Sequence, residues 1–259
     1  MEREIHPSAV IDPKAEIEEG VVIGPFSIVK EGVRIKKGTK LMSNVILEGD
    51  TEIGENCTIY PFTSIGLPPQ DMKYRGEKTG VKIGDNNTIR EYITIHRASV
   101  GGDGFTRIGN NNFLMAYVHI AHDCKLGSGI AMANVATLAG HILVEDHAVI
   151  GGLVAIHQFT RIGAYAMIGG FSGVGQDIPP YMTAAGARAK LFGPNTIGLK
   201  RHGFSDETIN ELKKAYKILF REKHTLKEAI KKVQENLPYT DEIKHLIEFI
   251  QANKRGICR

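Results

Sequence analysis

Aliphatic residues return at every sixth position along most of this chain. An amphipathic helix repeats its apolar face every three or four residues, so a period of six excludes a helix here. One inward aliphatic side chain per six residues instead suits a short strand followed by a tight turn. The series comprises Ile5, Ile11, Ile17, Ile23, Val29, Ile35, Leu41, Leu47, Ile53, Ile59, Ile65, Ile83, Ile89, Ile95, Ile108, Leu114, Ile120, Leu126, Met132, Leu138, Val144, Ile150, Ile156, Ile162, Ile168 and Val174.

Three such units close one triangular coil of 18 residues. Stacked coils bury their aliphatic side chains as internal ladders and pair their backbones at roughly 4.8 Å. The period therefore predicts a parallel β-helix of about eight or nine coils over residues 1–180. Glycines such as Gly24 and Gly54 follow the aliphatic position, where we expect turns in conformations that other residues avoid.

Two breaks in the period, at about 66–82 and 96–107, predict loops that leave the prism. Loops on a rigid scaffold often carry function. The period stops after Pro179 and Pro180, and residues 181–259 are predicted to form a linker and a small α-helical domain.

Three helix starts are expected in this C-terminal part. Ser205 can cap a helix that runs to about Glu222, Thr225 and Glu228 form a capping box, and Thr240 can begin a third helix.

Charge is unevenly distributed, although 32 Lys and Arg residues nearly balance 29 Asp and Glu residues. Residues 181–259 hold 16 basic and 9 acidic side chains, against 16 and 20 in the rest of the chain. This basic part is either a docking surface for an acidic partner or a solvated helical surface.

No apolar run is long enough to span a membrane, and the first residues do not form a signal peptide, so we expect a cytoplasmic protein. The three cysteines have no metal-ligand spacing. Glycine motifs that cradle phosphates and patterns typical of nucleic-acid binding are missing.

Several segments, in order along nearly the whole chain, resemble the UDP-N-acetylglucosamine O-acyltransferase family, a branch of the left-handed β-helix acyltransferases. They are PQDMKY at 69–74, TIHR at 94–97, HIAHDC at 119–124, ATLAGH at 136–141, IHQF at 156–159, QDIPPY at 176–181 and GLKR at 198–201. The resemblance implies a left-handed β-helix, an exception to the usual right-handed crossover.

The resemblance also implies an activity. The enzyme would move a 3-hydroxyacyl group from acyl carrier protein to the 3-hydroxyl of UDP-N-acetylglucosamine, which is the first step of lipid A synthesis. It implies a homotrimer with sites between subunits, no metal, and no cofactor beyond the phosphopantetheine of the carrier protein.

Positions 18 apart stack in columns, so sequence spacing indicates distance. His122, Gly140 and Gln158 share one column, Asp123 and His141 share the next, and His157 lies one step to the other side. Acyl transfer needs a base for the hydroxyl proton and a donor for the oxyanion. The resemblance assigns these roles to the His122 imidazole and the Gly140 backbone N–H, and the column agrees by placing them one coil apart.

The carboxylate that orients His122 stays open at this point. Asp123 is adjacent but would project to the opposite face of an extended segment. Asp71, in the first predicted loop of the same chain or of a neighbouring subunit, is an equally good partner.

The resemblance assigns substrate binding to a larger set, which comprises Gln70, Lys73, His96, His119, His141, His157, Gln158, Asn195 and Arg201. Ile197 and His202 replace the acidic and basic residues that the family pattern has there, which leaves the uridine contacts open. Gly170 resembles a position that limits acyl length, and it implies a fairly long 3-hydroxyacyl donor.

Three rival functions share this fold. A γ-class carbonic anhydrase would use histidines such as His119, His122 and His141 to bind zinc. A coenzyme A-dependent sugar acetyltransferase would take a small donor. A passive structural solenoid would need neither the histidine face nor the two loops.

Overall fold

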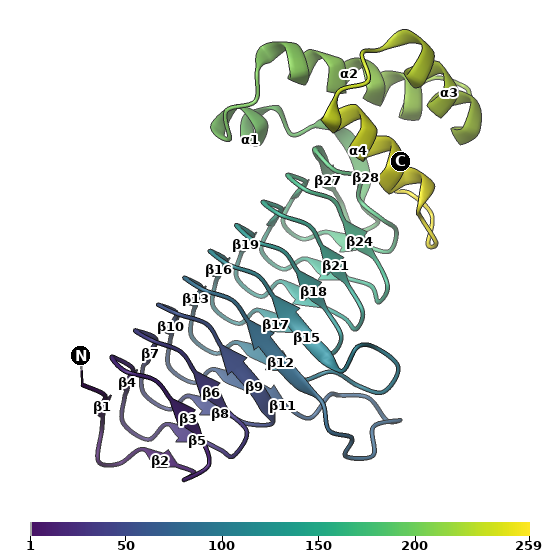
Figure 1. The fold of residues 1–259 in the computed structure, drawn as a ribbon. Coiled ribbons are helices and arrows are strands. Elements are labelled where there is room, and N and C mark those ends of the chain that lie inside the picture. The colour runs from purple at the N-terminus through teal and green to yellow at the C-terminus, as the bar shows by residue number, and fades with distance from the viewer. Residues whose placement is uncertain (1) are drawn as a thin grey trace.

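The computed structural model describes residues 2–259 and confirms a left-handed parallel β-helix (Figure 1). The chain winds through three sheets of 11, 9 and 8 strands, called sheets A, B and C below. The N-terminus lies at one end of the prism, and four helices cover the other end (Figure 1).

The strands are short, and most contain two residues. Sheet A holds β1 (Glu4–Ile5), β4 (Val22–Ile23), β7 (Lys40–Leu41), β10 (Thr58–Ile59), β13 (Thr88–Ile89), β16 (Phe113–Leu114), β19 (Ala131–Met132), β22 (Val149–Ile150), β25 (Met167–Ile168), β27 (Met182–Ala185) and β28 (Lys190–Pro194). Sheet B holds β2 (Val10–Ile11), β5 (Ile28–Val29), β8 (Ile46–Leu47), β11 (Ser64–Leu67), β14 (Thr94–His96), β17 (His119–Ile120), β20 (Thr137–Leu138), β23 (Ala155–Ile156) and β26 (Gly173–Val174). Sheet C holds β3 (Glu16–Ile17), β6 (Arg34–Ile35), β9 (Asp50–Ile53), β12 (Gly80–Ile83), β15 (Phe105–Ile108), β18 (Lys125–Leu126), β21 (Leu143–Val144) and β24 (Arg161–Ile162).

The predicted 18-residue register is confirmed in the strands that position the site. Ile120 pairs with Leu138, and Leu138 pairs with Ile156, in parallel and without a shift. All three side chains are buried in the prism. The aliphatic period therefore forms the internal ladders that hold neighbouring coils in register.

The expectation about the turn glycines is wrong at Gly24 and Gly54. Neither has a positive φ, whereas Asp123, His141 and Phe159 do, at 60°, 60° and 63°. A Cβ on Gly24 would lie 2.7 Å from the backbone of Met42 in the next coil. Close stacking of successive coils, rather than turn geometry, requires glycine there.

The prism has three corners, named here by the sheets that they join. The A–B corner carries turns such as 115–118, the B–C corner turns such as 121–124, and the C–A corner turns such as 145–148. Both predicted loops leave at the B–C corner, at residues 68–79 between β11 and β12 and at 97–104 between β14 and β15.

The helices are α1 (Thr196–Arg201), α2 (Asp206–Phe220), α3 (Leu226–Asn236) and α4 (Asp241–Gln251). The predicted N-caps are confirmed, because Ser205, Thr225 and Thr240 each accept a hydrogen bond from the first turn. The hexapeptide period did not predict β27 and β28, which extend sheet A as an antiparallel hairpin. None of the helices in residues 2–259 has the length and apolarity to cross a membrane.

Candidate active site

The centre of the candidate site is the B–C corner of two successive coils. His122 and Asp123 follow β17, and Gly140 and His141 follow β20. The backbone N–H of His141 donates to the carbonyl of His122 at 3.0 Å, so the two corners are in direct contact. The fold therefore brings these four residues together, as the column spacing predicted.

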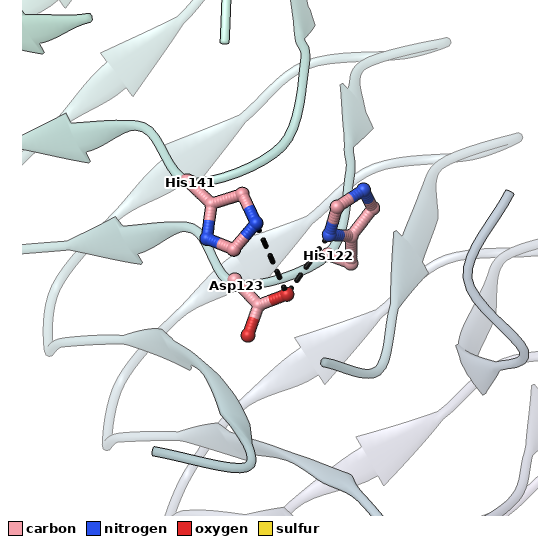
Figure 2. A group of neighbouring side chains, drawn as sticks. All are labelled: His122, Asp123 and His141. Carbon is pink, nitrogen blue, oxygen red and sulfur yellow. Dashed lines mark hydrogen bonds and ion pairs between the residues drawn. The ribbon is translucent and has the colours of Figure 1, made fainter. Parts of the chain in front are cut away.

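His122 and Asp123 form a hydrogen-bonded pair, with 2.8 Å between His122 Nδ1 and Asp123 Oδ2 (Figure 2). The expectation that Asp123 points to the opposite face is wrong. The positive φ of Asp123 ends the alternation of an extended strand, so its side chain turns back toward its neighbour. A carboxylate only accepts hydrogen bonds, so Nδ1 carries the proton and Nε2 keeps a free lone pair.

Asp123 is held by the second loop. The backbone N–H and the hydroxyl of Ser99 both donate to Asp123 Oδ2, at 2.9 and 2.8 Å. Burial opposes ionisation of this carboxyl, but the hydrogen bonds from His122 and Ser99 hold its pKa below the ordinary value. Asp123 is therefore a fixed anion that can stabilise a protonated His122.

The same group includes His141, whose Nε2 lies 3.8 Å from Asp123 Oδ2 (Figure 2). Ligand atoms of His122, Asp123 and His141 lie within 4.8 Å of one another, which is a set that could hold a metal ion. However, Asp123 Oδ2 already accepts three hydrogen bonds, from His122 and twice from Ser99. Coordination through this oxygen would have to displace them, whereas Asp123 Oδ1 is buried and has no hydrogen-bond partner within residues 2–259.

Gly140 lies directly against the imidazole of His122. A Cβ at position 140 would be 2.5 Å from His122 Cε1 and 2.7 Å from Nε2. Within residues 2–259 the N–H of Gly140 donates to no acceptor, which leaves it available. A reacting carbonyl beside Nε2 would therefore meet a bare backbone donor.

The next coils toward the C-terminus place further side chains above His122 and Gly140. His141 stacks on Phe159, with ring centroids 4.6 Å apart. His157 lies on the next coil, and its Nδ1 is 3.1 Å from a guanidinium nitrogen of Arg255. The corner above Gly140 therefore carries three rings, those of His141, Phe159 and His157, and one cation, Arg255.

His96 and His119 form a second pair below His122. Their rings meet edge to face at 5.0 Å, and His119 Nδ1 lies 2.6 Å from the hydroxyl of Thr94. Burial, together with the nearby His119 and His122, lowers the pKa of His96 to about 4. Burial likewise lowers the pKa of His119, so both rings are neutral near pH 7.

The first loop lies at the same corner, but within residues 2–259 no hydrogen bond or ion pair joins it to the His122 side chain. Asp71 Oδ1 accepts from the backbone N–H of Lys73 at 2.9 Å, and both Gln70 and Lys73 are exposed. Within one copy of the chain, Asp123 rather than Asp71 is the carboxylate that orients His122.

The remaining predicted residues lie at the other two corners. Asn195 caps α1 and donates to the carbonyl of Tyr165 at the C–A corner, where the ring of His202 also packs. Arg201 is exposed in the last turn of α1. Gly170 belongs to the A–B corner, next to the carbonyl of Gly152.

Sequence reasoning missed Ser99 and Arg255. Ser99 is 24 residues from Asp123, and Arg255 is 98 residues from His157. Neither separation is a multiple of the coil length, so no column predicted these contacts. Only the break at 96–107 indicated that a loop could return to the site.

The chain is similar to known proteins over nearly its whole length. Residues 177–258 match the family model described as UDP-N-acetylglucosamine O-acyltransferase, domain 2, and residues 32–66 match the bacterial transferase hexapeptide model. The chain is 72% identical over 256 residues to the acyl-[acyl-carrier-protein]--UDP-N-acetylglucosamine O-acyltransferase of Thermodesulfovibrio yellowstonii, covering 99% of both chains.

Two solved structures are also similar over almost their full length. One is LpxA from Acinetobacter baumannii, with 44% identity and a TM-score of 0.96, covering 98% of this chain and 99% of that one. The other is the UDP-N-acetylglucosamine O-acyltransferase of Moraxella catarrhalis, with 43% identity and a TM-score of 0.94, at the same coverage of 98% and 99%.

Proposed function

The chain belongs to the UDP-N-acetylglucosamine O-acyltransferase family, and from this we propose that it acylates UDP-N-acetylglucosamine. The donor is a 3-hydroxyacyl group on acyl carrier protein, and the acceptor is the 3-hydroxyl of the sugar. This is the reaction that opens lipid A synthesis. The observation that carries the proposal is the His122–Asp123 pair beside the free N–H of Gly140.

The reaction follows from this geometry. His122 Nε2 takes the proton of the 3-hydroxyl while the oxygen attacks the thioester carbonyl. The tetrahedral oxyanion accepts a hydrogen bond from the Gly140 N–H. The C–S bond then breaks, and the protonated His122 returns its proton to the departing thiolate. Asp123 stabilises the imidazolium between the two transfers.

The substrate-binding residues are spread over all three corners of one prism. His122, His141 and Lys73 belong to the B–C corner, Asn195 contacts the C–A corner and Gly170 belongs to the A–B corner. One substrate cannot reach three corners of the same prism. We therefore propose sites between subunits of a homotrimer, each built from corners of neighbouring copies.

The A–B corner supports self-association. Its turns carry a ladder of exposed apolar side chains that runs along the prism. Phe62, Tyr92 and Tyr117 stack with ring centroids 5.1 and 4.8 Å apart, and they are 51%, 44% and 55% exposed. A continuous apolar surface of this kind is typical of protein interfaces.

The test is an assay of the purified protein with 3-hydroxyacyl carrier protein and UDP-N-acetylglucosamine, followed by mass spectrometry of the product. We expect a singly acylated nucleotide sugar, and no product from acetyl-coenzyme A. His122→Ala should lower kcat by about 10²- to 10⁴-fold. Normal turnover in this variant would overturn the assignment of the base. Cytoplasmic location and independence of metals stay predictions.

A further inference from the structure

Two of the segments that resemble the acyltransferase family end in residues that the proposed reaction does not use. PQDMKY ends in Tyr74, on the first loop, and TIHR ends in Arg97, directly after β14. Arg97 Nε donates to the hydroxyl oxygen of Tyr74 at 3.1 Å. The guanidinium group also lies over the Tyr74 ring, 5.6 Å from its centroid. One side-chain contact therefore joins two segments whose last residues are 23 positions apart.

Arg97 is fixed on the prism side of this contact. Its side chain is only 17% exposed, and one guanidinium nitrogen donates to the carbonyl of Gly66 at 3.3 Å and lies 3.7 Å from Glu48 Oε1. A Cβ on Gly49 would come within 2.9 Å of the same nitrogen, so this coil leaves the side chain little freedom. Arg97 is thus a rigid donor to which the Tyr74 hydroxyl is bound.

The first loop has few other ties to the prism. Within residues 2–259, the hydrogen bonds of residues 68–78 other than the one from Arg97 stay inside the loop, as between the Lys73 N–H and the Asp71 carboxylate. A cavity of about 660 Å³ opens between the loop and the N-terminal coils, and both Tyr74 and Arg97 line it. The position of the loop therefore depends on its two ends and on the contact between Arg97 and Tyr74.

Arg97 also lies close to the catalytic corner along the chain. Two residues further on, the N–H and the hydroxyl of Ser99 donate to Asp123. Between them, the carbonyl of Ala98 accepts a hydrogen bond from the hydroxyl of Thr79, at the end of the first loop, at 2.6 Å. Three consecutive residues therefore connect the first loop with the carboxylate that orients the base.

We infer that Arg97 is a positioning residue for the nucleotide sugar and acts through Tyr74 and the first loop, an inference that rests on the proposed function. The loop carries Gln70 and Lys73, which are exposed and are expected to bind this substrate. A loop that is held in place before the substrate arrives loses less conformational freedom on binding. The contact thus strengthens binding of UDP-N-acetylglucosamine and leaves the chemical step at His122 unchanged.

The experiment compares Arg97→Lys with the wild-type enzyme. Lysine keeps the positive charge beside Glu48 but lacks the planar fork that donates to Tyr74 and Gly66 together. We expect KM for UDP-N-acetylglucosamine to rise about tenfold, the effect of losing a hydrogen bond from a charged group, with kcat and KM for the carrier-bound donor unchanged. Tyr74→Phe should raise the same KM. The double variant should raise it no further than Arg97→Lys alone, because both changes remove one contact.

Arg34→Lys is the matched control. Arg34 is a partly buried arginine of the N-terminal coils, and within residues 2–259 its ion pairs are with Asp50 and Glu52. Its substitution should leave KM for both substrates at the wild-type values. A purely structural role of Arg97 would lower the melting temperature and kcat and leave KM unchanged, a result that would contradict the inference.

Limited proteolysis reports on the loop without any measurement of activity. Lys73 and Arg75 are exposed trypsin sites in the first loop, and Arg97→Lys adds no site, since trypsin cleaves after lysine and arginine alike. We expect trypsin to cut the released loop of Arg97→Lys severalfold faster than that of the wild type, with the fragments identified by mass spectrometry. Tyr74→Phe should also be cut faster, whereas Arg34→Lys should be cut at the wild-type rate.

The outcomes separate this inference from the proposed function. Cleavage of Arg97→Lys at the wild-type rate, or a change in KM for the acyl donor alone, would overturn the inference and leave the function intact. Faster cleavage with an unchanged KM for the nucleotide sugar would also overturn it, because the loop would then not serve that substrate. Absence of acyl transfer in the wild type would refute the function, and the cleavage rates would still show whether Arg97 holds the loop.

Discussion

Gly140 and His122 are in contact across two coils, so closely that a Cβ at position 140 would lie 2.5 Å from His122 Cε1. Any larger residue at position 140 would push the His122 ring out of its place, so this position requires glycine. In the proposed reaction the same glycine supplies the N–H next to the reacting carbonyl. One residue thus fixes both the place of the base and that of the oxyanion donor.

Gly140→Ala should displace the His122 ring and lower kcat by about 10²-fold, the usual effect of disturbing an oxyanion donor. It should also lower the melting temperature, because the new methyl group has no room. In a His122→Ala background the ring is gone, and the same substitution should cost little stability. Melting temperatures of the four proteins measure this coupling, and additive effects would contradict the contact.

Ser99→Ala should lower the activity of the base without removing it. The Asp123 carboxylate loses one donor and interacts more strongly with protonated His122. The pH at which kcat/KM falls on the acid side should therefore rise. We expect kcat to fall about fivefold at neutral pH, the effect of losing one hydrogen bond.

Ser99→Thr keeps the hydroxyl and serves as the control for this change. It should restore the wild-type pH profile. A purely structural role of Ser99 would lower stability and leave the pH profile where it was.

His96 should make stability depend on pH. Its pKa is lowered from 6.5 to about 4 in the folded protein, so between these values the unfolded chain binds the extra proton. Stability should therefore be complete above pH 6.5 and decline as the pH falls toward 4. The full shift corresponds to an upper limit of about 3 kcal/mol.

The variant His96→Gln removes this titration. Melting temperatures measured from pH 4 to 7 should then fall less steeply on acidification than in the wild type. His6→Gln, at an exposed N-terminal position, is the matched control and should leave the slope unchanged. Parallel slopes for His96→Gln and the wild type would refute the prediction.

Gly170→Met should shift donor preference to shorter acyl chains, because the new side chain enters the space where a long chain would end. Competition between carrier-bound donors of different length, read by mass spectrometry, measures the shift. Unchanged selectivity would remove Gly170 from the acyl site.

Tyr92→Asp should dissociate the proposed homotrimer, since it places a charge in the middle of the apolar ladder of the A–B corner. Sedimentation velocity should show a loss of the trimer. Activity should fall together with the trimer, because each proposed site is built from corners of neighbouring copies. A trimer that survives this change would locate the interface elsewhere.

The period of six is enough to predict the coil of this protein and the spacing of residues along it. An aliphatic residue at each sixth position can be buried only inside an 18-residue coil, and a constant coil length turns sequence spacing into distance. For that reason the column of His122, Gly140 and Gln158 could be predicted. The caps at Ser205, Thr225 and Thr240 were equally local, since each needs only the first turn of its own helix.

The tertiary structure decided what the period does not encode. Asp123 orients His122 because a left-handed turn residue reverses its side chain, and strand alternation gives no sign of this. Ser99 and Arg255 reach the site from a loop and a tail whose paths depend on packing across many coils. Contacts within a repeat follow from spacing, whereas contacts made by segments that leave the repeat depend on where the rest of the chain allows them to return.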